Sequence, residues 1–441
     1  MELSPTTKNA LAALVDRVAE ATQDYPKLAR IFRNALLNTL QTTVQRKEDG
    51  TTFVITGDIP AMWLRDSAAQ VRPFLVLAAE DPELADMIEG LVRRQIACIL
   101  QDPYANAFNE GPTGRGHQAD RTEMTPWLWE RKYEIDSLCY PLQLAYLLWR
   151  NTGRTSHLDD AFAAAARRVL ATWRTEQHHE TSSTYAFERS DCPPTDTLPR
   201  DGRGAEVGYT GMTWSGFRPS DDACTYGYLV PSNMFAVVAL RQLAEMAREV
   251  LGDAALAADS EALLAEIDEG IRKHAIVEHP EHGRIFAYET DGFGHHQLMD
   301  DANVPSLLAI PYLGYIPASD PLYVHTRRFV LSRSNPYYYE GKAASGVGSP
   351  HTPEGYIWHI ALAMQGLTAA EREEKLRLLL LMADTDADAG MMHEGFSADD
   401  PASFTRPWFS WANMMFCELL MDYCGVRVRT AGREVPAPQG F

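Results

Sequence analysis

The chain has 441 residues, of which 45% are hydrophobic and 23% charged, and its formal net charge at pH 7 is −20. This composition is typical of a folded globular protein and excludes a disordered or collagen-like chain. A strongly negative surface repels phosphate backbones and anionic lipid head groups, so neither nucleic acid nor a membrane is expected as a partner, whereas a neutral ligand meets no such barrier.

Helical periodicity dominates the sequence, with few runs of alternating β-branched residues. Amphipathic helices with one charged face are predicted at about 6–40, 84–100, 158–173, 254–274, 322–332 and 371–383. Between them lie helices that are apolar nearly all round, at 62–77, 134–149, 222–243, 301–308, 355–364 and 408–423. Two short strands are predicted, at 51–55 and 283–288.

The alternation of these two kinds of helix predicts the fold class. A helix that is hydrophobic on all sides is buried. We therefore expect an all-α fold, an (α/α)6 barrel in which an inner ring of buried helices is wrapped by an outer ring of amphipathic ones, with minor short strands. No change in composition marks a linker, so one domain over 1–441 is predicted. The long loops 101–132 and 181–221 precede two of the buried helices, and loops of this length are usually functional.

Neither a secretory signal nor a membrane span is predicted. The N-terminus has no basic segment followed by an apolar run, and no stretch of about 18 apolar residues occurs. The six cysteines form no CxxC pair, which is typical of scattered core thiols rather than of a disulfide framework. We therefore expect a cytoplasmic protein.

The buried helices open with polar and aromatic residues, which a barrel would bring to one rim. Trp63, Arg65 and Asp66 form the first such opening. Tryptophan faces stack on the apolar side of a sugar ring, and planar charged groups hold pairs of hydroxyls, so this mixture suits a sugar. Each opening taken singly could instead be a helix-end ion pair beside a core tryptophan. Their shared character favours a pocket.

Two segments offer the carboxyl groups that glycoside cleavage needs, one as an acid and one as a base or nucleophile. The adjacent Asp221 and Asp222 repel each other as anions and burial adds to this, so one of them could keep a proton, although a following helix N-terminus favours the anion. Ser220 or Asp221 could instead cap that helix. Glu394 lies beside His393 in a glycine-flanked apolar loop, which suits a base that activates water better than a solvated surface position.

No metal or cofactor is predicted. The sequence has no HExxH, Walker A, GxGxxG or GxSxG motif. Asp384, Asp386 and Asp388 begin like a calcium loop, but its sixth position is Ala389 and its twelfth is Gly395, where such a loop requires Gly and Glu.

The segments that carry the candidate residues resemble glycoside hydrolase family 125. The matching segments are 56–68 (TGDIPAMWLRDSA), 216–224 (GFRPSDDAC), 231–235 (PSNMF), 332–338 (SRSNPYY), 392–394 (MHE) and 408–413 (WFSWAN). The resemblance extends over a core of about 25–425. It implies an (α/α)6 barrel that removes terminal α-1,6-linked mannose with inversion and without a metal, and it implies a mannose-containing oligosaccharide as substrate for a monomer or homodimer.

Carried over residue by residue, the resemblance places the general acid in the Asp221–Asp222 pair, with Asp221 favoured, and the general base at Glu394. It implies that Arg65 and Asp66 hold hydroxyls of the departing mannose. The other residues predicted to bind substrate are Trp63, Asp136, Asp222, Asn233, Ser334, Asn335, His351, His393, Trp408 and Trp411.

Two other functions remain open at this point. A sugar isomerase or epimerase would need paired histidines over the ring, and the sequence offers His351, His359 and His393. A non-catalytic sugar-binding module would keep the tryptophans without requiring Glu394. The loop 181–208 is an extension that none of these motifs covers, so the preference beyond the first sugar stays undetermined.

Overall fold

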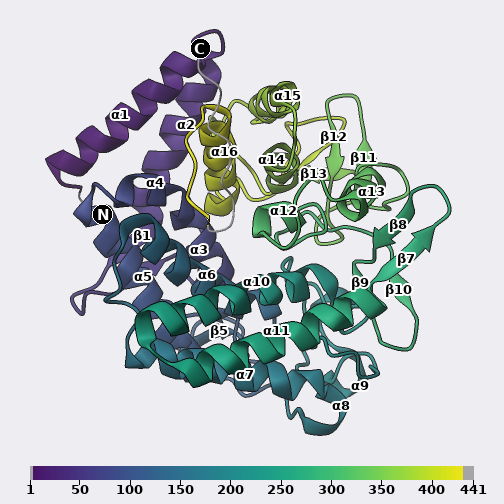
Figure 1. Cartoon of the computed structure of the whole chain (residues 1–441). Coiled ribbons are helices and arrows are strands. Elements are labelled where there is room, and N and C mark those ends of the chain that lie inside the picture. The colour runs from purple at the N-terminus through teal and green to yellow at the C-terminus, as the bar shows by residue number, and fades with distance from the viewer. Residues whose placement is uncertain (1–2, 431–441) are drawn as a thin grey trace.

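The computed structural model, which describes residues 3–430, consists of helices joined by loops and short strands (Figure 1). The longer helices are α1 (Pro5–Ala21), α2 (Pro26–Asn38), α3 (Leu64–Val71), α5 (Pro82–Gln101), α6 (Ile135–Thr152), α7 (Asp160–Gln177), α10 (Val230–Met246), α11 (Ala254–His274), α13 (Pro321–Val330), α14 (His359–Leu367), α15 (Arg372–Asp384) and α16 (Ser410–Tyr423). The single-turn helices are α4 (Leu75–Ala78), α8 (His179–Ser182), α9 (Pro199–Gly202) and α12 (Ile310–Leu313). Within 3–430, none of the helices is both long and apolar enough to span a bilayer.

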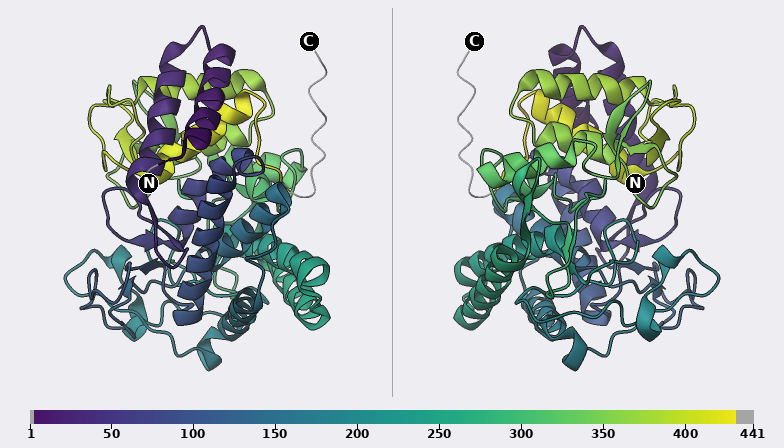
Figure 2. Two further views of the ribbon diagram at one scale, coloured as in Figure 1. Left: turned by 90° about the vertical axis from the view of Figure 1, so that its left-hand side faces the viewer. Right: turned by 90° about the vertical axis from the view of Figure 1, so that its right-hand side faces the viewer.

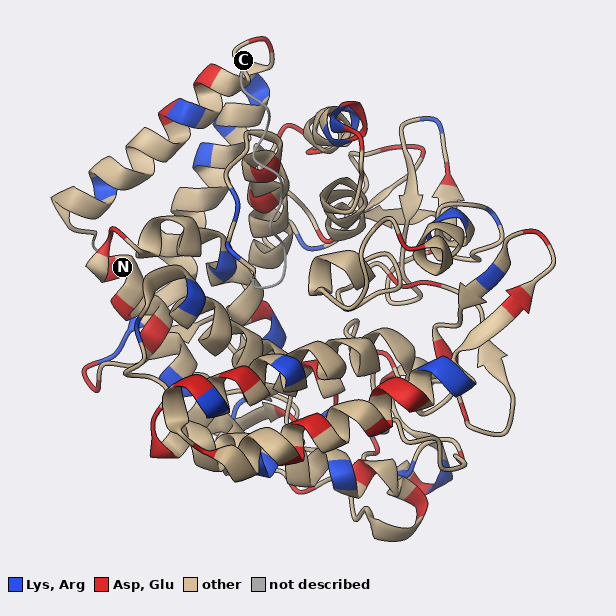
Figure 3. Ribbon diagram, viewed as in Figure 1, with Lys and Arg blue, Asp and Glu red and all other residues tan. Residues whose placement is uncertain are grey.

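Buried helices pack side by side, and more polar helices cover them. α16 packs on α3, α3 on α6, α6 on α10, α10 on α12, and α14 on α16. On the outside, α5 covers α6, α11 covers α10, α15 covers α14, and α2 covers α16. Figure 3 shows Asp and Glu interspersed with Lys and Arg along the outer helices α7 and α11. Figure 2 shows the N-terminal pair α1–α2 lying against the C-terminal helices.

Short antiparallel strands pair across the ends of the helices. The pairs and triplets are β1–β2 (Val44–Arg46, Thr52–Val54), β3–β4–β5 (Met62–Trp63, Ala107–Phe108, Leu128–Glu130), β6–β9–β10 (Tyr228–Leu229, Glu289–Thr290, His296–Gln297), β7–β8 (Ile276–His279, Gly283–Phe286), β11–β12 (Tyr338–Glu340, Ser345–Val347) and β13–β14 (Tyr356–Trp358, Gly395–Ser397). The strands β3, β6 and β13 run directly into α3, α10 and α14. Their pairing fixes where each of these buried helices begins.

Most of the predicted elements are confirmed within a few residues. The helices α5, α6, α7, α11, α13, α14, α15 and α16 and the strands β2 and β8 lie where the sequence pattern places them. The stretch 6–40 is divided into α1 and α2, because Pro26 begins a new helix after a turn. The stretch 62–77 is likewise divided into β3, α3 and α4.

The helix predicted over 222–243 is α10, which begins later than expected. The chain before it makes a turn, closed by the bridge between Phe217 and Ala223, in which Asp221 has φ +68°. A residue with left-handed backbone in a closed turn cannot start an α-helix. Neither Ser220 nor Asp221 therefore caps a helix.

The helix predicted over 301–308 is wrong. The carboxylate of Asp300 accepts hydrogen bonds from the backbone N–H groups of Leu307 at 2.8 Å and Leu308 at 3.0 Å. These donors are bound by a side chain, so the segment is a loop, and the next helix is the single turn α12.

The hydrophobic core includes residues from α1 to α16, such as Leu11 and Met421. A second, small cluster of Ala61, Trp63 and Ala107 lies at the β3–β4–β5 sheet. It forms one wall of the region described next.

Candidate active site

A small pocket lies where the buried helices begin. It is lined by Thr56, Ile59, Trp63, Arg65, Asp66, Pro219, Ser220, Asp221, Asn303, His351, Trp358, Glu394, Arg406 and Phe409. The segments that supply these residues are far apart in the sequence. The pocket thus brings together six of the predicted site residues: Trp63, Arg65, Asp66, Asp221, His351 and Glu394.

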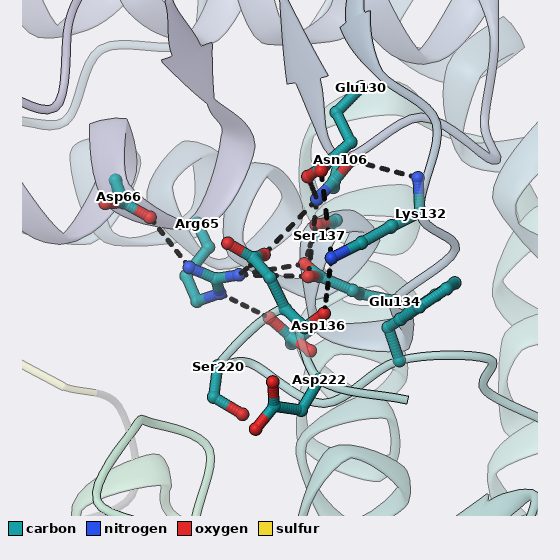
Figure 4. A network of polar contacts seen from close by, with 12 residues as sticks. Arg65, Asp66, Asn106, Glu130, Lys132, Glu134, Asp136, Ser137, Ser220 and Asp222 are labelled. Atoms are coloured by element: carbon teal, nitrogen blue, oxygen red, sulfur yellow. Dashed lines mark hydrogen bonds and ion pairs between the residues drawn. The ribbon is translucent and has the colours of Figure 1, made fainter. Parts of the chain in front are cut away.

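One buried arginine organises the inner side of the pocket (Figure 4). The guanidinium of Arg65 is bound by four carboxylates, with Nη1 at 2.8 Å from Asp66 Oδ2, Nη2 at 3.0 Å from Glu134 Oε2, Nε at 3.1 Å from Asp136 Oδ2, and Nη2 at 3.1 Å from Asp221 Oδ1. Glu134 and Asp136 come from the start of α6 and are buried, whereas Asp221 is 26% exposed. The carboxyl of Asp221 is therefore the most solvent-exposed of the four that bind Arg65.

Four carboxylates lie around a single guanidinium, and burial raises the pKa of three of them. Burial raises the pKa of Asp66 to about 6 and that of Asp136 to about 6, although the charge of Arg65 opposes the change. Burial and the neighbouring carboxylates raise the pKa of Glu134 well above its ordinary value. Burial acts in the same direction on Asp221, but Arg65 together with Glu134, Lys132 and His351 outweighs it and lowers the pKa of that carboxyl.

Glu134 and Asp221 share hydrogen-bond donors. Arg65 Nη2 donates to both, and Asn106 Nδ2 lies 3.4 Å from Glu134 Oε1 and 3.3 Å from Asp221 Oδ1. Burial raises the pKa of Glu134, which has no access to solvent, whereas the pKa of Asp221 is lowered. Of the two carboxyls, Glu134 is therefore the stronger base.

Asp222 faces away from this cluster and contacts a histidine. Its Oδ1 accepts a hydrogen bond from His351 Nδ1 at 3.2 Å, and Asp222 itself is 3% exposed and does not line the pocket. Burial lowers the pKa of His351, but the contact with Asp222 outweighs it and raises that pKa to about 9. At neutral pH the pocket therefore contains an imidazolium, which Asp222 holds in place.

Glu394 lies on the opposite side, immediately before β14. Its Oε1 is 3.4 Å from Arg406 Nη1, and the residue is 5% exposed. Arg406 is fixed in turn, because its Nε lies 3.0 Å from Asp58 Oδ2 and its guanidinium lies 4.2 Å from the ring centroid of Phe409. Glu394 is thus a nearly buried carboxylate on the pocket wall with one cation beside it.

Two further predicted residues support Arg65 from behind and do not line the pocket. Asp136 makes the ion pair described above, and the ring of Trp411 lies 5.4 Å from the Arg65 guanidinium. Both are fully buried. They orient the arginine and do not face the pocket.

Five predicted residues lie outside the pocket lining, where their side chains make other contacts: Asn233, Ser334, Asn335, His393 and Trp408. The Asn233 amide donates to backbone carbonyls in the turn before α10, and Asn335 Oδ1 accepts from a backbone N–H. Ser334 donates to a surface glutamate, and Trp408 Nε1 donates to the side chain of an asparagine on α2. His393 stacks on a phenylalanine ring at 3.7 Å.

Several residues around the site were not predicted, although the sequence carried a signal for some of them. Glu134 and Arg406 are charged residues at the openings of α6 and α16, so their position alone marked them. Asn106 and Lys132 belong to the loop 101–132, whose length marked it as functional. Asn303 lies in the polar opening of the segment predicted as a helix over 301–308, so the same signal marked it although the helix itself is absent.

The structure places the other candidate groups elsewhere. Within residues 3–430, no three His, Cys, Asp or Glu side chains are arranged to bind a metal, and Asp386 instead accepts from Lys27 Nζ at 2.8 Å. Of the three histidines that an isomerase would use, only His351 lines the pocket; His359 and His393 are buried outside it.

A family profile described as "Metal-independent alpha-mannosidase (GH125)" matches residues 25–421. The chain belongs to this family of glycoside hydrolases. GH125 membership agrees with the pocket of carboxylates, arginines and tryptophans described above.

Individual relatives extend the comparison. The "Meiotically up-regulated gene 157 protein" of Schizosaccharomyces pombe is 40% identical over 432 residues, which cover 92% of this chain and 84% of that protein. A solved metal-independent α-mannosidase from Streptococcus pneumoniae, in a non-productive substrate complex with α-1,6-mannobiose, is 51% identical and has a TM-score of 0.94 over 95% of this chain and 99% of that one.

A more distant likeness concerns the fold alone. A bacterial glucoamylase complexed with acarbose has a TM-score of 0.61 at 13% identity, over 90% of this chain and 56% of that one.

Proposed function

We propose that this GH125 protein is an exo-acting α-1,6-mannosidase that removes non-reducing terminal mannose from oligosaccharides with inversion. The observation that carries the proposal is the presence of Asp221 and Glu394 on one small pocket, because glycoside cleavage by inversion needs an acid on one side of the sugar and a base on the other. A relative at 51% identity was solved with α-1,6-mannobiose, which supports the linkage.

The proposed architecture is one (α/α)6 barrel domain. The sequence of contacts among α3, α6, α10, α12, α14 and α16, with other helices outside them, supports an inner and an outer ring. The site lies at the end of the inner ring where the strands β3, β6 and β13 lead into the helices. A cytoplasmic location stays a prediction.

The proposed general acid is Asp221. In the empty pocket the charge of Arg65 helps to keep its pKa low, and the neighbouring Glu134, whose pKa is raised, is the proposed source of the proton. A bound sugar displaces water from the exposed part of Asp221, and the loss of solvation raises its pKa. The proton then passes from Glu134 to Asp221 and from there to the glycosidic oxygen as the bond to mannose breaks.

The proposed general base is Glu394, which takes a proton from the attacking water. That water forms the new bond to the anomeric carbon on the face opposite the leaving group, so an α-mannoside yields β-mannose. Arg406 orients the carboxylate of Glu394, and the His351 imidazolium and Asp66 supply contacts for sugar hydroxyls. Afterwards Glu134 regains a proton from solvent and Glu394 releases one to solvent. Each cleaved bond therefore consumes one water molecule.

The test is a comparison of α-1,2-, α-1,3- and α-1,6-linked mannobiose, with released mannose as the readout. We expect release from the α-1,6 compound, and proton NMR in the first minutes should show the β anomer before mutarotation. Saturable binding without release would overturn the hydrolase assignment. Initial α-mannose, or a covalent sugar adduct on Glu394, would overturn inversion.

A further inference from the structure

A buried lysine holds the backbone of the proposed acid. Lys132 Nζ donates a hydrogen bond to the carbonyl oxygen of Asp221 at 2.6 Å, and Lys132 is 1% exposed. Asp221 has φ +68°, a left-handed conformation that residues other than glycine adopt rarely. Such a conformation persists only where the surrounding contacts fix it.

The turn around Asp221 is fixed by backbone and side-chain contacts. The N–H of Asp221 donates to Arg218 O at 2.9 Å, and the N–H of Arg218 donates to Asp222 O at 2.8 Å. The bond from Lys132 adds a charged donor, which makes it stronger than a bond between two neutral peptide groups. Without it, the carbonyl of Asp221 loses its charged donor, and we expect the orientation of the carboxyl relative to Arg65 to be less well fixed.

Lys132 is itself held by the long loop 181–208. It forms an ion pair with Asp196, and Arg189 Nη1 lies 3.0 Å from the other oxygen of that carboxylate. Arg189 Nη2 also lies 2.8 Å from Glu130 Oε1, and Lys132 Nζ lies 3.8 Å from the same oxygen. Burial disfavours the charge on Lys132, but Glu130, Asp221 and Asp196 outweigh burial and raise its pKa, so the lysine is a cation at neutral pH.

The same loop contacts the segment after the acid. The N–H of Ala223 donates to Thr195 O at 2.7 Å. Thr195 and Asp196 are neighbours, so the loop binds the turn of Asp221 once through Lys132 and once through the backbone. None of the residues of 181–208 is among those that line the pocket.

We propose that Lys132 is a positioning residue for the general acid, and that the loop 181–208 contributes to catalysis by holding Lys132 through Asp196. The inference rests on the proposed function of Asp221. Lys132 does not line the pocket, so it acts through the backbone of Asp221 and does not touch the sugar. The loop sets the orientation of the acid.

The test compares a substrate that needs the acid with one that does not. Lys132→Met keeps the length of the side chain and removes the charge and the donor. We expect kcat/KM for α-1,6-mannobiose to fall about 30-fold, because a misplaced acid loses most of its contribution. The value for 2,4-dinitrophenyl α-mannoside should fall less than about threefold, because its leaving group departs without a proton.

A second variant and a control keep the outcome decisive. Asp196→Asn leaves Lys132 in place and lies at a partly exposed position (28%), so we expect this variant to fold even if Lys132→Met does not. The ratio of the kcat/KM values for the two substrates should change in the same direction by about three- to tenfold. Lys375→Met removes another largely buried lysine, one paired with Asp422 between α15 and α16, and should leave the ratio unchanged.

The results separate the inference from the proposed function. A wild-type protein that hydrolyses neither substrate would refute the mannosidase assignment. The other informative result requires an active wild type and folded Lys132→Met and Asp196→Asn variants. If kcat/KM of these variants falls equally for both substrates, or falls for neither, the positioning role is refuted and the mannosidase assignment stays intact.

Discussion

Replacing Asp222 by Asn should lower the pKa of His351, which the structure raises to about 9. The two side chains are 3.2 Å apart at Nδ1 and Oδ1. Two opposite charges about 4 Å apart attract by roughly 4 kcal/mol at an effective dielectric constant of about 20. The imidazole is 38% exposed, so solvent screening reduces this to about 1–2 kcal/mol, which corresponds to about one pKa unit.

The assay is an NMR titration of the His351 side chain between pH 5 and 10, together with the pH profile of kcat/KM. The variant should titrate about one unit lower, and the contribution of the imidazolium to binding should be lost at correspondingly lower pH. Asp291→Asn, which breaks the His295–Asp291 contact of 2.6 Å on the surface, is the matched control and should leave His351 unchanged. An unchanged His351 midpoint in Asp222→Asn would refute the reasoning.

The same pair predicts a pH-dependent effect on stability. A histidine whose pKa is raised on folding contributes stability fully below its unfolded pKa of about 6.5, and the contribution is lost as pH rises through the folded value. The melting temperature of Asp222→Asn should therefore lie furthest below that of the wild type near pH 6. The difference should disappear above pH 10, where His351 is neutral in both proteins.

Other predictions concern the proposed catalytic groups. Asp221→Asn should reduce kcat/KM for α-1,6-mannobiose by about 10²–10⁴-fold and that for the dinitrophenyl mannoside much less; equal losses would count against its role as the acid. Glu394→Gln should reduce kcat/KM for both substrates by a similar large factor, because water must be activated in either reaction. Retention of activity on the dinitrophenyl mannoside would contradict a base at this position. Prolonged EDTA treatment should leave activity unchanged, and a loss that Ca²⁺ restores would show that a metal is required.

The sequence predicted most of the helices because their periodicity is local. The amphipathic α11 lies where its pattern places it, at Ala254–His274. The failures occurred where side chains replace backbone hydrogen bonds, as at Asp300, which binds two backbone N–H groups in a segment predicted as a helix. Composition cannot distinguish such a loop from a short buried helix.

The site was predictable to the extent that it is built at helix openings. Arg65 and Asp66 were singled out because they open a predicted buried helix beside Trp63, a mixture that suits a sugar, and the structure places both on the pocket. Asn233 occupies a similar position in the sequence, yet its amide binds the backbone. Whether such a side chain faces the pocket or the backbone depends on the turn that precedes its helix. The turn before α10 contains a left-handed residue, Asp221, and single-sequence patterns do not reveal this.

The packing of α16 against α3 and α14 has a consequence for how the molecule is made. The contact with α3 joins residues 64–71 to residues 410–423, so α3 meets this neighbour only after more than 300 further residues have been synthesised. Until then α3 and α14 each expose an apolar face, and incomplete chains of this kind tend to aggregate. Arg406 and Glu394 also arrive late in synthesis, so a nascent chain lacks one wall of the pocket and gains it in the same event that closes the core.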